Sequence, residues 1–148
     1  MHQDDGVAFE DIKAEFLEEF IEHTVTELEM FSDELERRGH GPLPHPEHGW
    51  PNLDRTLCTL IAILDEGGED GDLMQYTVGR YLGEVVRLRF GGEWLGVELN
   101  DDGVPEPMLV GHEMDPPEAF NPFEVVARLR SGSGMPDIWA FIEQCVRR

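Results

Sequence analysis

A periodic run of apolar residues between positions 7 and 38 constrains this chain more than any other feature. Large apolar side chains recur there at steps of three and four residues, and acidic residues fill most positions between them. The apolar set comprises Phe9, Ile12, Phe16, Phe20, Leu28, Phe31 and Leu35, with Leu17, Ile21 and Val25 bridging the gaps. This spacing predicts one long amphipathic helix that buries a single face. A helix of that length would extend about 45 Å, more than a compact domain of this size, so we expect a kink or a projecting end.

The C-terminal end of this helix carries recognisable stop signals. Arg37 and Arg38 lie in the last turn, where cations suit the negative end of a helix, and Gly39 follows at the usual left-handed stop position. The run from Ser32 to Glu36 resembles a second helix start, which makes residue 32 a candidate for a break.

The acidic charge of the chain is concentrated on the same segment. Residues 1–36 hold 13 acidic residues and one lysine, so they carry −12 of the formal net charge of −21. Nucleic acids and anionic membrane surfaces require cationic partners, so we expect neither to bind. The acidic face instead suits a basic protein surface, and its candidate binding residues are Glu15, Glu18, Glu19 and Glu22.

The remaining sequence predicts an α+β fold that is mostly helical. We expect a single domain over 1–148, with residues 7–38 as the long acidic helix and 52–147 as a compact core. Turn and capping residues divide that core into a proline-rich loop at 40–51, helices at 53–66 and 72–90, strands at 93–99 and 104–111, a helix at 122–131 and a last helix from 136. The fold is thus three N-terminal helices, one antiparallel hairpin and two C-terminal helices.

The spacing of apolar residues also predicts which faces of these elements are buried. Helix 53–66 would bury Leu53, Leu57, Leu60, Ile61 and Leu64, and helix 72–90 would bury Leu73, Met74, Val78, Tyr81, Leu82, Val85 and Leu88. Gly79 and Gly83 leave a groove on the second helix where another backbone can approach closely. Helix 122–131 would turn Phe123, Val126 and Leu129 inward.

The two strands carry different signals. Leu95, Val97 and Leu99 share one face of the first strand, whereas Trp94 points away from that face and is either covered by a helix or an exposed anchor. In the second strand, Pro105 and Pro107 remove two N–H groups from the same side, which predicts an edge strand.

No segment carries a recognised catalytic motif. Cys58 lies on an apolar helix, so we expect both it and Cys145 to be core residues, and two cysteines fit a reducing cytoplasm. The best metal alternative is a loop holding His40, His45 and His48 beside Glu47, although proline-rich loops often carry such histidines without a metal. We predict no catalytic residues and no cofactor.

Glu84 is the most informative single residue outside the acidic helix. It follows Tyr81 on a partly buried face, where a carboxylate can serve as an acid, a base or a partner-binding group. Arg80 and Arg87 lie within salt-bridge reach along the helix, so a structural ion pair is the favoured interpretation. We include Tyr81, Glu84 and Trp94 among the candidate binding residues.

Three short patterns resemble small bacterial domains of unknown function. They are Y-L-G-E at 81–84, G-G-E-W at 91–94, and P-F-E-V-V-A-R-L at 122–129, and the resemblance spans residues 73–142. Some relatives look like immunity or accessory proteins of bacterial toxin systems, so the resemblance implies a binding role by analogy, and it carries over no settled biochemical activity.

Two hypotheses therefore follow. The first is a non-enzymatic protein-binding domain, immunity-like or regulatory, whose acidic helix meets a basic partner. The second is a small metal-assisted hydrolase that uses the His40–His48 loop or Glu84. A homodimer through the long helix is compatible with either hypothesis.

Overall fold

The computed structural model describes residues 4–49, 53–67, 69–99, 103–110 and 121–131. They form α1 (Asp4–Arg37), the 3-10 helix η1 (Pro46–His48), α2 (Leu53–Glu66), α3 (Glu69–Phe90), β1 (Glu93–Leu99), β2 (Pro105–Val110) and α4 (Pro122–Arg130). This order confirms a mostly helical α+β fold with one antiparallel hairpin. The helix predicted from residue 136 lies outside the described residues.

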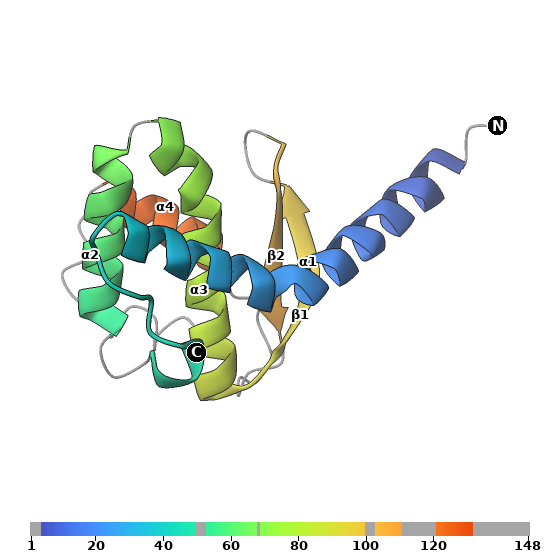
Figure 1. The fold of residues 1–148 in the computed structure, drawn as a ribbon. Coiled ribbons are helices and arrows are strands. Elements are labelled where there is room, and N and C mark those ends of the chain that lie inside the picture. The colour runs from blue at the N-terminus through green and yellow to red at the C-terminus, as the bar shows by residue number, and fades with distance from the viewer. Residues whose placement is uncertain (1–3, 50–52, 68, 100–102, 111–120, 132–148) are drawn as a thin grey trace.

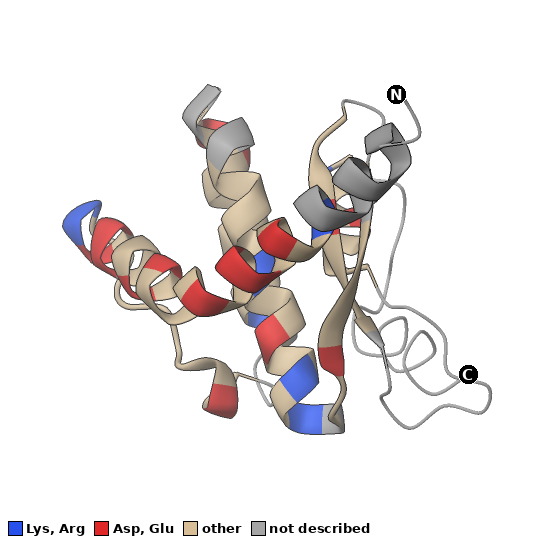
Figure 2. Ribbon diagram, turned by 90° about the vertical axis from the view of Figure 1, so that its right-hand side faces the viewer, with Lys and Arg blue, Asp and Glu red and all other residues tan. Residues whose placement is uncertain are grey.

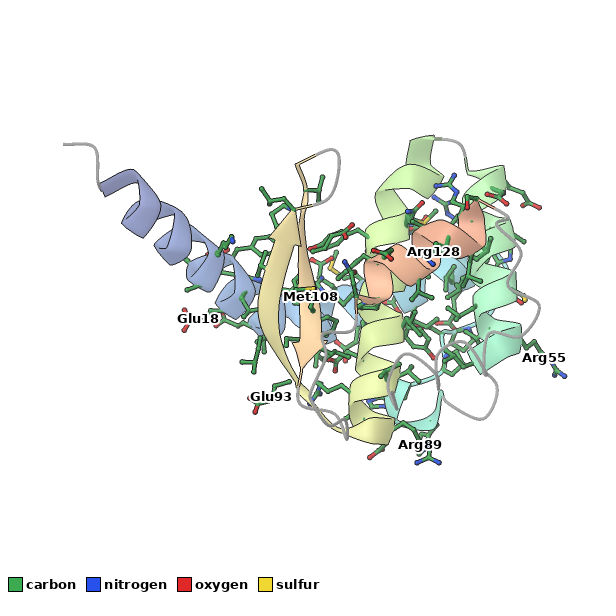
Figure 3. The ribbon with its side chains drawn as sticks, turned by 180° about the vertical axis from the view of Figure 1, so that it is seen from behind. Glu18, Arg55, Arg89, Glu93, Met108 and Arg128 are labelled. Atoms are coloured by element: carbon green, nitrogen blue, oxygen red, sulfur yellow. The ribbon has the colours of Figure 1, made fainter. Side chains whose placement is uncertain are left out.

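Helix α3 occupies the centre of the molecule (Figure 1). Helix α1 crosses one side of α3 and α4 crosses the opposite side, while the hairpin lies along one flank between them and α2 along the other, as the view from behind also shows (Figure 3). The N-terminal part of α1 extends beyond the hairpin, which confirms the predicted projecting end (Figure 1). No helix within the described ranges is long and apolar enough to span a membrane.

Helix α1 runs without a break through residue 32, so the second helix start considered there is wrong. The Ser32 hydroxyl instead accepts a hydrogen bond from the backbone N–H of Leu43 at 2.9 Å, which ties the following loop to the helix. The helix ends as predicted, because Gly39 adopts a φ of 86° and the N–H of His40 bonds back to the carbonyl of Leu35. The loop therefore turns back along α1 and approaches α3.

The core forms where α1, α2, α3, β1 and α4 meet, and most of the predicted apolar positions are buried there. The most deeply buried large side chains are Leu53, Leu57, Leu64, Val78, Tyr81, Leu82, Val85, Val86, Leu109 and Val126. Three positions on the predicted apolar faces are instead exposed, namely Ile21, Val25 and Leu88. Cys58 is also exposed, because it lies on the solvent side of α2, so its expected core position is wrong.

The hairpin presents Trp94, not the leucines of β1, to the helices. Trp94 is 4% exposed, whereas Leu95 and Leu99 are exposed. A bulge between Trp94 and Gly96 leaves Leu95 without a partner position on β2. Within the described part of the chain, β2 pairs only with β1, as its two prolines predict.

The two glycines of α3 form the groove that their spacing predicts. A Cβ atom at Gly79 would overlap the ring of Phe123, and one at Gly83 would overlap the indole of Trp94. Helix α4 starts at this contact, where Asn121 caps it by accepting hydrogen bonds from the N–H groups of Phe123 and Glu124. The hairpin and α4 therefore meet on one face of α3.

Candidate functional site

Glu84 is a residue of α3 whose side chain faces the hairpin, and it is 8% exposed. Its Oε2 atom accepts hydrogen bonds from Nε of Arg87 at 2.9 Å and from Nε1 of Trp94 at 2.8 Å. Its Oε1 atom accepts a third from Nη2 of Arg87 at 3.0 Å. The bond to Glu84 raises the pKa of Arg87 above its ordinary value. This carboxylate thus fixes the position of Trp94 and leaves no oxygen atom without a donor.

Arg80, the other predicted partner of Glu84, forms no direct pair with it. Its guanidinium lies 4.0 Å above the ring of Phe20 and donates to the Phe20 carbonyl at 3.4 Å. One of its nitrogens lies 3.9 Å from Glu27. Burial lowers the pKa of Arg80, and its Nε atom has no hydrogen-bond partner among the described residues. Arg80 therefore connects α3 to α1, because the ring and carbonyl of Phe20 lie on that side.

Tyr81 is completely buried under the loop that precedes α2. A Cβ atom at Gly49 would lie 2.7 Å from the Tyr81 hydroxyl, so glycine is what allows this loop to pack so closely. The hydroxyl has no hydrogen-bond partner in the described part of the chain. Tyr81 and Trp94 thus belong to the core, and neither is an exposed anchor on the protein surface.

The four acidic candidates on α1 have the opposite environment. Glu15, Glu18, Glu19 and Glu22 are all exposed, and acidic residues gather along this helix (Figure 2). None of the four forms an ion pair with another described residue. Figure 3 shows Glu18 directed away from the body of the molecule. Their charge is therefore available to a partner.

The histidine loop does not assemble a ligand set. His45 uses its Nδ1 atom to accept the N–H of Glu47 at 3.1 Å, and its ring centroid lies 6.2 Å from that of His48. Over the described ranges, no group of three or more histidine, cysteine, aspartate or glutamate side chains is placed to hold a metal ion. His40 adjoins a separate hollow beside α2.

A groove between α1, α3 and the loop at 43–46 is the feature that sequence reasoning missed. It contains a pocket of about 360 Å³, in the size range of ligand sites, and a second of about 250 Å³ beside Trp94. Four residues line both pockets, namely Thr24, Val25, Glu84 and Arg87. The others are Leu28, Glu29, Ser32, Leu43, Pro44, His45, Pro46 and Leu88 around the first pocket, and Ile21, Glu93 and Trp94 around the second. We call this combined surface the α1–α3 groove.

The apolar stripe of α1 is wider than the part of it that packs into the core. The apolar residues left exposed at its edge form one wall of the groove. Thr24 is buried and its hydroxyl donates to the Phe20 carbonyl at 2.7 Å, while Val25 beside it remains 66% exposed and Ile21 47% exposed. The sequence signal was present in the pair Ile21 and Val25, which extends the stripe by one row beyond Phe20 and Leu28. Only the packing of α3 shows that this row has no cover within the described structure.

The chain was compared with protein-family models, curated proteins and solved structures, and no match was found in any of the three comparisons.

Proposed function

We propose that this chain is a non-enzymatic protein-binding domain, immunity-like or regulatory, whose partner presents a basic surface. The observation that carries the proposal is the set of exposed carboxylates at Glu15, Glu18, Glu19 and Glu22, which form no ion pair with another described residue and lie on a helix that extends from the body. Such a surface increases the rate of encounter with a cationic partner and disfavours anionic ones.

The chemistry of the buried polar groups supports a binding role over catalysis. Glu84 is held by three donors and connects two elements, which is the arrangement of a structural ion pair. The resemblance to small bacterial domains with immunity-like relatives, and the cytoplasmic location expected from the cysteine content, are parts of the same proposal.

The proposal is tested in two steps. Affinity capture from the native host at low salt supplies candidate partners, and the association rate of each purified candidate is then measured by stopped flow between about 20 and 500 mM NaCl. We expect a rate that falls steeply with salt, and a further reduction of about tenfold at low salt when Glu15, Glu18, Glu19 and Glu22 are all replaced by glutamine.

A matched variant controls for net charge alone. Replacement of Asp33, Glu36, Glu47 and Glu66 by the corresponding amides removes the same number of exposed charges elsewhere. We expect this variant to associate within about threefold of the wild-type rate. A partner whose association is insensitive both to salt and to the change at residues 15–22 would contradict the proposal.

A further inference from the structure

We propose that the α1–α3 groove is the docking site for an amphipathic helix of the basic partner. In this arrangement the helix places apolar side chains against Ile21, Val25 and Leu88 and directs lysine or arginine side chains to the acidic rim. The inference rests on the proposed protein-binding function and adds the site and the form of the ligand.

The exposed apolar side chains are the first argument for an occupant. Ile21, Val25 and Leu88 are between 44% and 66% exposed, and they converge on one groove together with Leu43 and Pro44. Contiguous apolar surface with a polar rim is typical of interaction sites, because its burial is favourable by about 25 cal/mol per Å².

The shape of the groove favours a helix as the ligand. The lining residues of α1 run from Ile21 to Ser32, which corresponds to about 16 Å along the helix axis, or about three turns. The opposite wall is the C-terminal half of α3, and the loop at 43–46 closes one end. Because α1 crosses α3, the α1 wall sets the length of the groove, and it is long enough for an amphipathic helix of about three turns with anchors at positions i, i+3 or i+4, and i+7.

The charge of the groove decides between acidic and basic ligands. The floor is the Glu84–Arg87 pair, in which the two charges offset one another. Glu29 and Glu93 lie on the rim, both exposed and neither in an ion pair within the described structure. Figure 3 shows Glu93 directed outward at the start of β1. The rim is therefore negative, and cationic residues flanking the apolar face of the ligand would complete it.

The same charge argues against a second copy of this chain as the occupant. Each copy carries a net charge of −21, and the helix beside the groove carries much of it. Two copies in contact here would bring acidic faces together, which is unfavourable at ordinary ionic strength. We therefore assign the groove to a basic partner.

A peptide library tests the assignment with the full-length protein. Peptides of about 14 residues carry apolar residues at helical spacing, and acidic, basic or neutral polar residues are varied between them. Immobilised wild-type protein selects from this library, and the selected peptides are measured by fluorescence anisotropy. We expect basic amphipathic helices, with affinity lost on scrambling of the apolar positions at constant composition.

Two variants of α1 locate the binding surface. Val25→Asp introduces a charge in the middle of the groove and should weaken peptide binding by at least about tenfold. Met30→Asp makes the same charge change at a residue on the same helix that is 60% exposed and outside the groove, and should change affinity by less than about twofold. Urea unfolding of both variants verifies that the fold is unchanged.

Each other outcome would overturn the assignment. The groove is not the docking site for a basic helix if the library yields acidic peptides or no peptides. The same conclusion follows if the selected peptides bind Val25→Asp as well as wild type. A dimer in analytical ultracentrifugation that Val25→Asp dissociates would assign the groove to a second copy. Destabilisation by Val25→Asp as large as that of a core substitution would show that the chain itself covers the position.

The partner experiment separates this inference from the function on which it rests. If the glutamine variant at residues 15–22 slows partner association while Val25→Asp has no effect, the protein-binding function is supported and the groove assignment fails. If neither variant affects association, both proposals fail.

Discussion

Glu84 joins the C-terminal half of α3 to the hairpin through donors on two different elements. Sequence spacing identified Arg87 as a partner correctly, because residues three apart on a helix face the same side. The same rule failed for Arg80, which turns to the ring and carbonyl of Phe20 on α1. Spacing along a helix thus identifies possible partners, and the neighbouring element decides among them.

Truncation of Glu84 should destabilise the protein. In Glu84→Ala, Arg87 can turn to water because it is partly exposed, while the buried indole N–H of Trp94 loses its acceptor, so we expect a loss of about 2 kcal/mol in the free energy of unfolding. Urea denaturation measures the change. Glu124→Ala, which removes an exposed ion pair with Arg128, is the control and should cost less than about 1 kcal/mol. Equal effects of the two substitutions would refute a structural role for Glu84.

Both tyrosines of the chain, Tyr76 and Tyr81, should resist ionisation in the folded protein. Burial raises the pKa of each above the usual value of about 10. The hydroxyl of Tyr76 also donates to the carbonyl of Pro105 at 2.8 Å. A native titration followed at 295 nm should show little phenolate at pH 10.5, whereas the same protein in urea should titrate with a pKa of about 10.

The raised tyrosine pKa values also define how stability depends on alkaline pH. A group whose pKa is higher in the folded state retains its proton there while the unfolded chain loses it, so unfolding becomes more favourable as pH rises. The contribution of the tyrosines should be complete below pH 10 and decline above it. An unfolding free energy that stays constant from pH 9 to 11.5 would contradict this assignment.

At the scale of elements, two glycines of α3 allow side chains of neighbouring elements to pack directly against its backbone. Gly83 lies against the indole of Trp94 and Gly79 against Phe123, and these two aromatic rings also contact Phe20 of α1. The aromatic cluster thus joins α1, β1 and α4 at the flank of α3 that faces the hairpin. Sequence analysis predicted a close approach at the glycines, but it could not name the side chains that enter.

Gly83→Ala tests this contact. Alanine normally stabilises a helix interior by about 1 kcal/mol relative to glycine, but here its methyl group would overlap the indole of Trp94. We expect a net destabilisation of about 1–3 kcal/mol, measured by urea unfolding. The double variant with Trp94→Phe should lose less than the sum of the two single changes, because a smaller ring makes room for the methyl group. A stabilised Gly83→Ala protein would show that the contact is loose.

At the scale of the whole molecule, the net charge of −21 opposes compaction. Glu15, Glu18, Glu19 and Glu22 lie within about two turns of α1, so part of this repulsion is local. The thermal unfolding midpoint should therefore rise when NaCl increases from about 20 to 500 mM, as salt screens the repulsion.

The variant with glutamine at Glu15, Glu18, Glu19 and Glu22 has a net charge of −17 instead of −21. Its thermal unfolding midpoint should therefore depend less on salt than that of wild type. Differential scanning calorimetry across the salt series measures both proteins. Identical salt dependence would indicate that these acids do not repel one another appreciably in the folded state.

The sequence by itself determined the helices, the hairpin and the acidity of α1, because these depend on local spacing, capping residues and turn residues. The structure confirms the start and end of α2 as predicted, and the end of α1 to within a residue. The position of each charged group along its helix was likewise readable from the sequence.

Only the tertiary structure decided which apolar residues are covered. Val25 and Phe20 belong to the same stripe in sequence, yet Phe20 enters the aromatic cluster and Val25 remains exposed, because α3 and the loop at 43–46 stop short of it. Whether an apolar residue of α1 is buried depends on where helices and loops distant in sequence cross α1. No local sequence pattern determines where they cross. For that reason the acidic face could be predicted, while the apolar groove beside it could not.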